Sequence, residues 1–173
     1  MSDLEQAARD FLALRRIAVV GVARGGDLPA NLVFRKLRSA GYEVFPVNPN
    51  AESVEGVASY ASVGAIPGGV EGAVVATHPA VAPSVVDDCA AAGVRTVWLH
   101  RSFGAGSVSD EAIERCRRHG LAAIPGGCPM MHRDPVDVGH KCIRFLCRVT
   151  GKLPEPIAAR PGAAPVRPPG PGR

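Results

Sequence analysis

Short apolar runs rich in β-branched residues recur along this chain, and turn residues or helix-length segments separate them. Runs of this length and composition are typical of strands that are buried on both faces of a parallel sheet. We therefore expect a five-stranded sheet. Its strands are Ile17 to Val22, Tyr42 to Val47, Gly72 to Thr77, Arg95 to His100 and Leu121 to Ile124.

Helix-length segments lie between these runs and stop at glycine, the residue favoured just after a helix. They are Asn31 to Ala40, Pro83 to Ala92 and Ser109 to His119, and Val57 to Gly64 is expected to form the remaining crossover. Alternating strands and helices joined by right-handed crossovers form a parallel sheet that is covered on both sides. The sequence thus predicts a doubly wound, Rossmann-like α/β fold with strand order 3-2-1-4-5 and helices on both faces.

The ends of the chain differ in character. Ser2 and Glu5 form a capping-box pattern for a first helix that is expected to reach about Leu14. A last helix is expected from Val136 to about Val149. We expect residues 1–150 to form one domain. Residues 151–173 are dense in Pro and Gly and have no apolar periodicity, which predicts a disordered tail.

The charge of the chain is concentrated in that tail. The formal net charge is +4, and the tail supplies four basic residues against Glu155 alone, so the domain itself is nearly neutral. Only 5% of the residues are aromatic. A nucleic-acid binder needs a basic face with stacking aromatics, so we expect no such partner.

The amino end carries acidic residues where a secretory signal needs basic ones, and no apolar run is long enough to cross a bilayer. We expect a cytoplasmic protein with no membrane partner. Its five cysteines have irregular spacing, so reduced thiols are expected rather than a disulfide framework.

A glycine-rich loop follows the first predicted strand. Gly21-Val22-Ala23-Arg24-Gly25-Gly26 fits the pattern G-x-A-x-x-G, a relaxed form of the dinucleotide-binding fingerprint. Small residues let the backbone approach a pyrophosphate, whose charge the next helix start stabilises. A structural glycine turn remains the alternative. For Arg24, the alternatives are a pair with phosphate oxygens and a solvated charge.

The end of the second strand separates the ligand classes. An NAD site usually has Asp or Glu there to hold the ribose 2′-hydroxyl. This chain has Pro46-Val47-Asn48-Pro49, with neither a carboxylate nor an Arg that would indicate NADP. The pattern therefore disfavours a nicotinamide-dependent oxidoreductase.

Reactive side chains follow the other strand ends. They are His78, His100, Cys128 and His132. If the strands are placed correctly, these residues lie together along the edge of the sheet where the strands end, which we call the rim. Such groups suit zinc or an activated thiolate. Their spacing matches no known metal motif, so packing and hydrogen-bonding roles are favoured and no metal is predicted.

Four segments of the chain resemble the coenzyme A-binding domain family: VVGVAR (19–24), GYEVFPVNP (41–49), AGVRTVWLH (92–100) and IPGGCPMMH (124–132). Members of this family are small stand-alone proteins similar to the amino-terminal domain of the succinyl-CoA synthetase alpha subunit. The resemblance covers about residues 16–132. The final segment departs from it at Met130-Met131-His132, where many relatives have an acidic residue before the His.

The resemblance implies bound coenzyme A, with its phosphates near Gly21 to Gly26 and its adenosine end at Asn48 and Pro49. The loop Thr77-His78-Pro79 would border the cofactor. A pantetheine arm along the rim would pass His100 and Cys128, and oxidation could then join Cys128 to the cofactor thiol.

The synthetase carries its phosphohistidine in a second domain that this chain is too short to contain. We expect non-catalytic binding of coenzyme A or an acyl-CoA. An NAD(P)-dependent oxidoreductase and a non-catalytic subunit of an acyl-CoA ligase or transferase are the alternatives. The acyl group stays open, as does the choice between a homodimer and a partner enzyme subunit.

Overall fold

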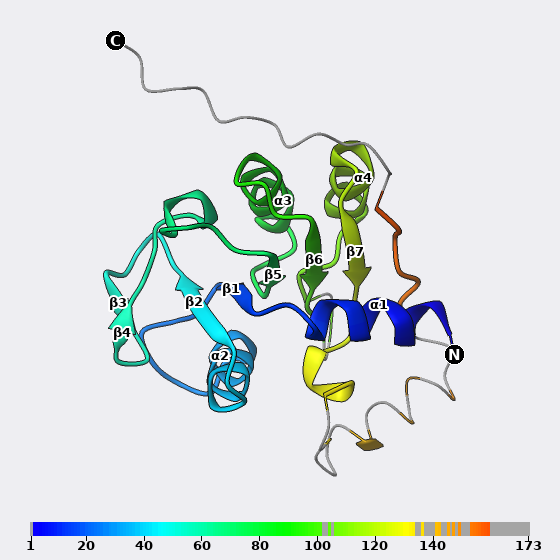
Figure 1. Cartoon of the computed structure of the whole chain (residues 1–173), viewed down its shortest axis with the longest axis horizontal. Helices are drawn as coiled ribbons and strands as arrows, with labels where there is room; N and C mark the ends of the chain where they lie inside the picture. The colour runs from blue at the N-terminus through cyan, green and yellow to red at the C-terminus, as the bar shows by residue number, and fades with distance from the viewer. Residues whose placement is uncertain are drawn as a thin grey trace.

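The computed structural model describes residues 2–101, 104, 106–133, 136, 141–142, 145, 147, 149 and 153–159. Five parallel strands form its central sheet in the order β2-β1-β5-β6-β7 (Figure 1). The strands are β1 (Arg16–Val20), β2 (Glu43–Val47), β5 (Gly72–Val75), β6 (Thr96–Leu99) and β7 (Ala122–Pro125). All five predicted strands are thus present, and the predicted Rossmann-like fold class is confirmed.

The predicted strand order needs one clarification. The strand at Gly72–Val75, third in the predicted series, lies beside β1 and not outside β2. The position next to β2 on its outer side is taken by Tyr60, which forms a single parallel bridge with Val47. Among the five strands named from the sequence the order is therefore 2-1-3-4-5, and it is equivalent to 3-2-1-4-5 when Tyr60 is counted as the third strand and β7 as the sixth. A single bridge has too few apolar residues to be recognised as a strand from periodicity.

Between β2 and Tyr60 lies a small antiparallel hairpin, β3 (Ser53–Val54) and β4 (Val57–Ala58). Its turn residues Glu55 and Gly56 have φ angles of 51° and 75°. Two residues with positive φ are typical of the tight hairpin turns that match strand twist. Only β4 lies in the segment Val57 to Gly64 that was expected to form the crossover, and β3 with the turn precedes it.

In the described part of the chain, helices cover both faces of the sheet (Figure 1). The helices α1 (Asp3–Leu12) and α2 (Pro29–Ser39) pack against side chains such as Ile17, Val19 and Trp98. The helices α3 (Ala82–Ala91) and α4 (Asp110–His119) pack against the opposite face. The described residues also include the short 3-10 helices η1 (Val63–Ala65) and η2 (Pro129–Met131). Alternate residues of each strand point to opposite faces, and both faces are covered, which explains why the strands are mostly apolar after their first residue.

The predicted helix ends are present. Ser2 and Glu5 form the capping box of α1, and Ser109 caps α4 by accepting a hydrogen bond from the amide of Ala112. Gly41, Gly93 and Gly120 follow their helices with φ of 88°, 79° and 68°. Glycine is favoured there because it adopts positive φ without steric cost.

The start of β1 is held by the carboxylate of Glu71. Its Oε2 accepts hydrogen bonds from the amides of Arg15 and Arg16, at 2.7 and 2.9 Å. These bonds lower the pKa of Glu71 below its ordinary value of 4.5. A carboxyl whose pKa is lowered by folding stabilises the native state above its unfolded pKa, and that contribution is lost as pH falls through the lowered value.

A Glu71→Gln variant should therefore be less stable than the wild type near neutral pH, and the difference should shrink as the pH falls below about 4. Urea denaturation of both proteins across this pH range measures the effect. A stability gap that is the same at every pH would show that the charge of Glu71 does not contribute.

The carboxyl-terminal segment is described in part. Ile157 pairs with Ala123 of the edge strand β7, its amide donating to the Ala123 carbonyl at 2.7 Å and its carbonyl accepting at 2.9 Å. The expectation of disorder from residue 151 therefore does not extend to the segment around Ile157. For residues 160–173, and for most of the expected last helix, the prediction concerns positions outside the described residues.

Candidate functional site

The chain turns sharply at Gly21, immediately after β1. Gly21 has φ of +101°, and a Cβ atom placed on it would lie 2.5 Å from the carbonyl oxygen of Ala76, which follows β5. Its amide donates to the carbonyl of Val47 at the end of β2, at 2.9 Å. Only glycine combines this φ with so close a backbone approach. The glycine loop thus begins where β1, β2 and β5 end together.

Residues 24–26 of the glycine loop Gly21–Gly26 are exposed. Within the described chain, the N–H groups of Arg24, Gly25 and Gly26 have no hydrogen-bond partner. The helix α2 begins just beyond, with Pro29 in its first turn and no side chain capping its amino end. Free amides and the positive end of a helix dipole together favour an anionic ligand.

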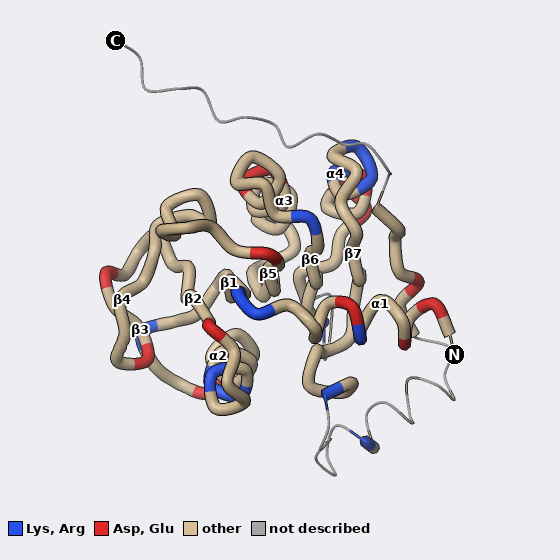
Figure 2. Tube along the Cα trace, viewed as in Figure 1, with Lys and Arg blue, Asp and Glu red and all other residues tan. Residues whose placement is uncertain are grey.

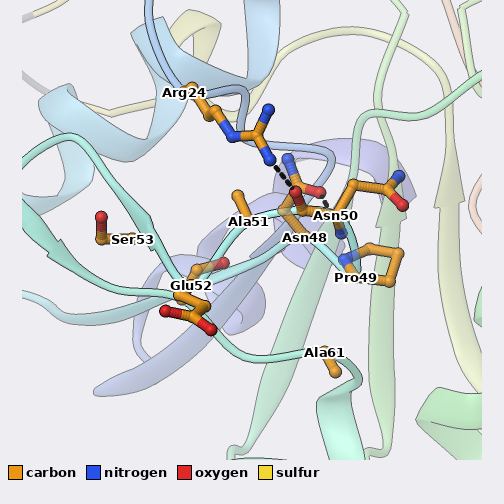
Figure 3. A pocket seen from close by; sticks show the side chains of 9 residues that line it. Arg24, Asn48, Pro49, Asn50, Ala51, Glu52, Ser53 and Ala61 are labelled. Carbon is orange, nitrogen blue, oxygen red and sulfur yellow. Dashed lines mark hydrogen bonds between the residues drawn. The ribbon is translucent and has the colours of Figure 1, made fainter.

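A cavity of about 780 Å³ lies beside this loop (Figure 3). Arg24 reaches across it, and its guanidinium donates to the carbonyl of Asn50. Asn48 donates through Nδ2 to the Val22 carbonyl at 2.8 Å and accepts through Oδ1 from the Asn50 amide at 2.8 Å. The side chain of Asn48 therefore links the backbone of Val22 to the backbone of Asn50 beside the cavity. The other lining residues are Pro49, Ala51, Glu52, Ser53, Ser59 and Ala61.

A second cavity of about 400 Å³ adjoins the first and shares with it the stretch Asn48 to Asn50 and Ala61. It lies among the ends of β1, β2 and β5 and the start of α3. Apolar side chains line much of it, and the polar side chains of Thr77, Ser84 and Asp88 join them. In this sheet, the order reverses between β1 and β5. Ligands of open α/β sheets bind at such a switch point.

The structure divides the predicted site residues into two groups. Gly21, Arg24, Asn48, Pro49 and Thr77 line the two cavities. The remaining predicted residues lie outside the two cavity linings, and they are Val22, Ala23, Gly25, Gly26, His78, Pro79, His100 and Cys128. Of the latter group, Val22 is fully buried in the core, while Ala23, Gly25 and Gly26 belong to the glycine loop itself.

The histidines and Cys128 have separate surroundings. His78 is exposed, and its Nδ1 accepts from the amide of Ala80 at 3.2 Å. His100 and Cys128 are buried at 4% and 3% exposure, on neighbouring strand ends that an antiparallel bridge between Arg101 and Gly127 joins. His132 lies against Trp98, with ring centroids 5.8 Å apart. Among the described residues, no three His, Cys, Asp or Glu side chains are grouped so that they could hold a metal.

Sequence reasoning missed several cavity residues. Ser62, Ser84 and Asp88 line the second cavity, and Asp88 also accepts from the amide of Val63 at 2.7 Å. The positions of Ser84 and Asp88 in the helix that follows β5 were the available signal, because residues four apart lie on one helix face. Asn31 was also missed, although it is an amide side chain in the first turn after the glycine loop.

A glycine turn after the first strand, an uncapped helix start and cavities at the switch point define a Rossmann-like domain of the cofactor-binding type. The chain belongs to the family described as the CoA binding domain, whose sequence profile matches residues 15–134. The family resemblance found in the sequence is thus confirmed.

Individual relatives support the assignment. The chain is 28% identical over 114 residues to the uncharacterized protein YneT of Bacillus subtilis, covering 66% of this chain and 82% of YneT. It is 30% identical over 121 residues to an ADP-forming acetate–CoA ligase of Archaeoglobus fulgidus, of which it spans 18%. A solved structure of a hypothetical protein from Pyrococcus horikoshii superposes with a TM-score of 0.70 at 28% identity, covering 76% of this chain and 91% of that one.

None of the helices in the described part of the chain is sufficiently long and apolar to span a membrane.

Proposed function

We propose that this chain binds coenzyme A or an acyl-CoA without itself catalysing a reaction. The diphosphate would lie against the glycine loop, and the adenosine portion would occupy the cavity beside Asn48 and Pro49. The observation that carries the proposal is the close backbone approach at Gly21, which lies so near the carbonyl of Ala76 that a side chain is excluded. Such a turn brings main-chain amides within reach of a pyrophosphate.

The surroundings of Asn48 support coenzyme A over NAD. Both polar groups of this side chain bond to the protein backbone, and an uncharged amide stands where an NAD site places a carboxylate. Arg24, at the mouth of the cavity, supplies a cation that suits phosphate oxygens. Membership of the CoA binding domain family supports the same ligand.

Thermal unfolding in the presence of coenzyme A, acetyl-CoA, NAD, NADP and ADP tests the proposal. Coenzyme A at 100 times its dissociation constant should stabilise the protein by about 2.7 kcal/mol, which corresponds to a rise in Tm of roughly 5–10 °C for a domain of this size. Stabilisation by NAD with none by coenzyme A would reverse the assignment.

An Arg24→Ala variant should bind coenzyme A about tenfold more weakly, because a charged hydrogen bond contributes about 1.5 kcal/mol or more. Isothermal titration calorimetry measures the dissociation constant. Arg95→Ala is the matched control. Arg95 is also exposed, but it precedes β6 and so lies at the amino ends of the strands, whereas Arg24 follows the carboxyl end of β1. Equal affinities for the wild type and Arg24→Ala would remove Arg24 from the site.

The pantetheine arm would extend from the second cavity past Thr77, His78 and Pro79 toward His100 and Cys128. Cys128 is only 3% exposed, so a mixed disulfide with the cofactor thiol would require the segment that precedes η2 to open. Mass spectrometry of the protein oxidised with coenzyme A would detect the adduct.

The ligase relatives favour a second candidate, in which this chain is a binding subunit of an acyl-CoA ligase. The ADP-forming acetate–CoA ligases are much longer, and the chain spans 18% and 27% of two of them. A partner chain would then supply catalysis. Ligase activity measured with this chain alone should be absent under this candidate and under the leading one, while a co-purifying ligase subunit would favour the second.

A further inference from the structure

Asn31 has a fully buried polar side chain that is hydrogen-bonded to the glycine loop. Its Oδ1 accepts from the amide of Ala23 at 3.1 Å, and its Nδ2 donates to the carbonyl of the same residue at 2.9 Å. The side-chain amide of Asn31 therefore bonds to both the N–H and the carbonyl of Ala23. This residue directly precedes the free amides of Arg24 to Gly26.

Glu55, at the turn of the β3–β4 hairpin, reinforces the orientation that the backbone of Ala23 already gives to the Asn31 amide. Its Oε1 accepts from Asn31 Nδ2 at 2.6 Å. An ionised carboxylate only accepts hydrogen bonds, so it requires the nitrogen of the Asn31 amide to face the hairpin. The oxygen of that amide is then left to face the amide of Ala23.

The same carboxylate oxygen also binds Arg35, one helical turn beyond Asn31. Arg35 Nη1 donates to Glu55 at 3.0 Å and to the carbonyl of Gly26 at 3.4 Å. Both donors to Glu55 thus reach the glycine loop, one at Ala23 and one at Gly26. The side chain of Glu55 is 14% exposed, so water competes little for these bonds. Figure 2 shows the hairpin and α2, with their acidic and basic positions, on the same side of the molecule.

The backbone of Glu55 has φ of 51°, a region that L-residues other than Asn and Asp seldom occupy. Glycine would adopt this turn with less strain. A glutamate at this position is therefore unfavourable for the turn of the hairpin itself.

We infer that Glu55 is a positioning residue for the cofactor site: through Asn31 and Arg35 it holds the glycine loop in the shape that presents the amides of Arg24 to Gly26 to a diphosphate. The inference rests on the proposed function for its ligand. The hairpin also borders the first cavity through Ser53, and Ser59, which directly follows β4, lines the same cavity.

The test compares the wild type with Glu55→Gly, a change that relieves the strained turn and removes the carboxylate. Amide hydrogen exchange at Ala23, followed by NMR without ligand, should be at least about tenfold faster in the variant. The dissociation constant for coenzyme A should rise about tenfold, because affinity falls with the fraction of molecules that hold the competent shape. Tm should stay close to that of the wild type, because relief of the strained turn offsets part of the loss of the hydrogen bonds to Asn31 and Arg35.

Asp27→Asn is the matched control, since Asp27 is the other carboxylate bound to Arg35 but is 85% exposed. It should leave exchange at Ala23 unchanged and should not weaken coenzyme A binding. Unchanged exchange in Glu55→Gly would overturn the inference, as would unchanged affinity in that variant when the wild type binds. A wild type that does not bind coenzyme A would instead refute the proposed function, and the exchange at Ala23 would still decide the role of Glu55 in shaping the loop.

Discussion

Replacing Gly21 with alanine should destabilise the protein by about 4 kcal/mol and abolish measurable binding of coenzyme A. The positive φ costs a non-glycine residue about 1–3 kcal/mol. The overlap with Ala76 forces a further backbone shift of similar cost, because the new Cβ would lie 2.5 Å from a carbonyl oxygen and not from a flexible side chain. Urea denaturation and calorimetric titration measure the two effects.

Gly25→Ala is the control for this change. Gly25 has no positive φ requirement, and a Cβ atom placed there meets nothing within 4 Å. Its stability should stay within about 0.5 kcal/mol of the wild type. If Gly21→Ala were as stable as Gly25→Ala, the close approach of Gly21 to the carbonyl of Ala76 would not be a feature of the protein in solution.

Replacing Trp98 with alanine should destabilise the protein by about 3–5 kcal/mol, the range for large aromatic side chains truncated in a core. Trp98 is fully buried on β6, and its ring meets Phe11 of α1 edge-on, with centroids 5.4 Å apart. Its Nε1 donates to the carbonyl of Gly126 at 2.9 Å. Urea denaturation followed by circular dichroism measures the loss without relying on tryptophan fluorescence.

Trp98→Phe separates the two roles of this side chain. Phenylalanine keeps much of the contact with Phe11 but leaves the Gly126 carbonyl without its donor, at a cost of about 1–3 kcal/mol. Leu32→Ala, at a 41% exposed position of α2, should cost less than either change. Equal losses for Trp98→Ala and Leu32→Ala would contradict the central place of Trp98 in the packing of α1 on the sheet.

Local patterns in the sequence determined the elements of this fold. The five apolar runs, the capping pattern at Ser2 and Glu5, and the glycines that end the helices each depend on residues a few positions apart. Steric limits on φ and the burial of alternate side chains act over such short distances. The glycine loop after β1 was predictable for the same reason, and the family was indicated by this loop together with residues 41–49, 92–100 and 124–132.

Contacts between distant parts of the chain were decided only by the tertiary structure. The single bridge from Tyr60 to Val47, the pairing of Ile157 with Ala123 and the bond from Asn31 to Glu55 join residues with no shared periodicity. The same holds for Ser84 and Asp88, which are ordinary helix residues until α3 is placed beside the ends of β1 and β5. Which surfaces meet depends on the packing of the whole core, and a side chain acquires its partner only when that packing is complete.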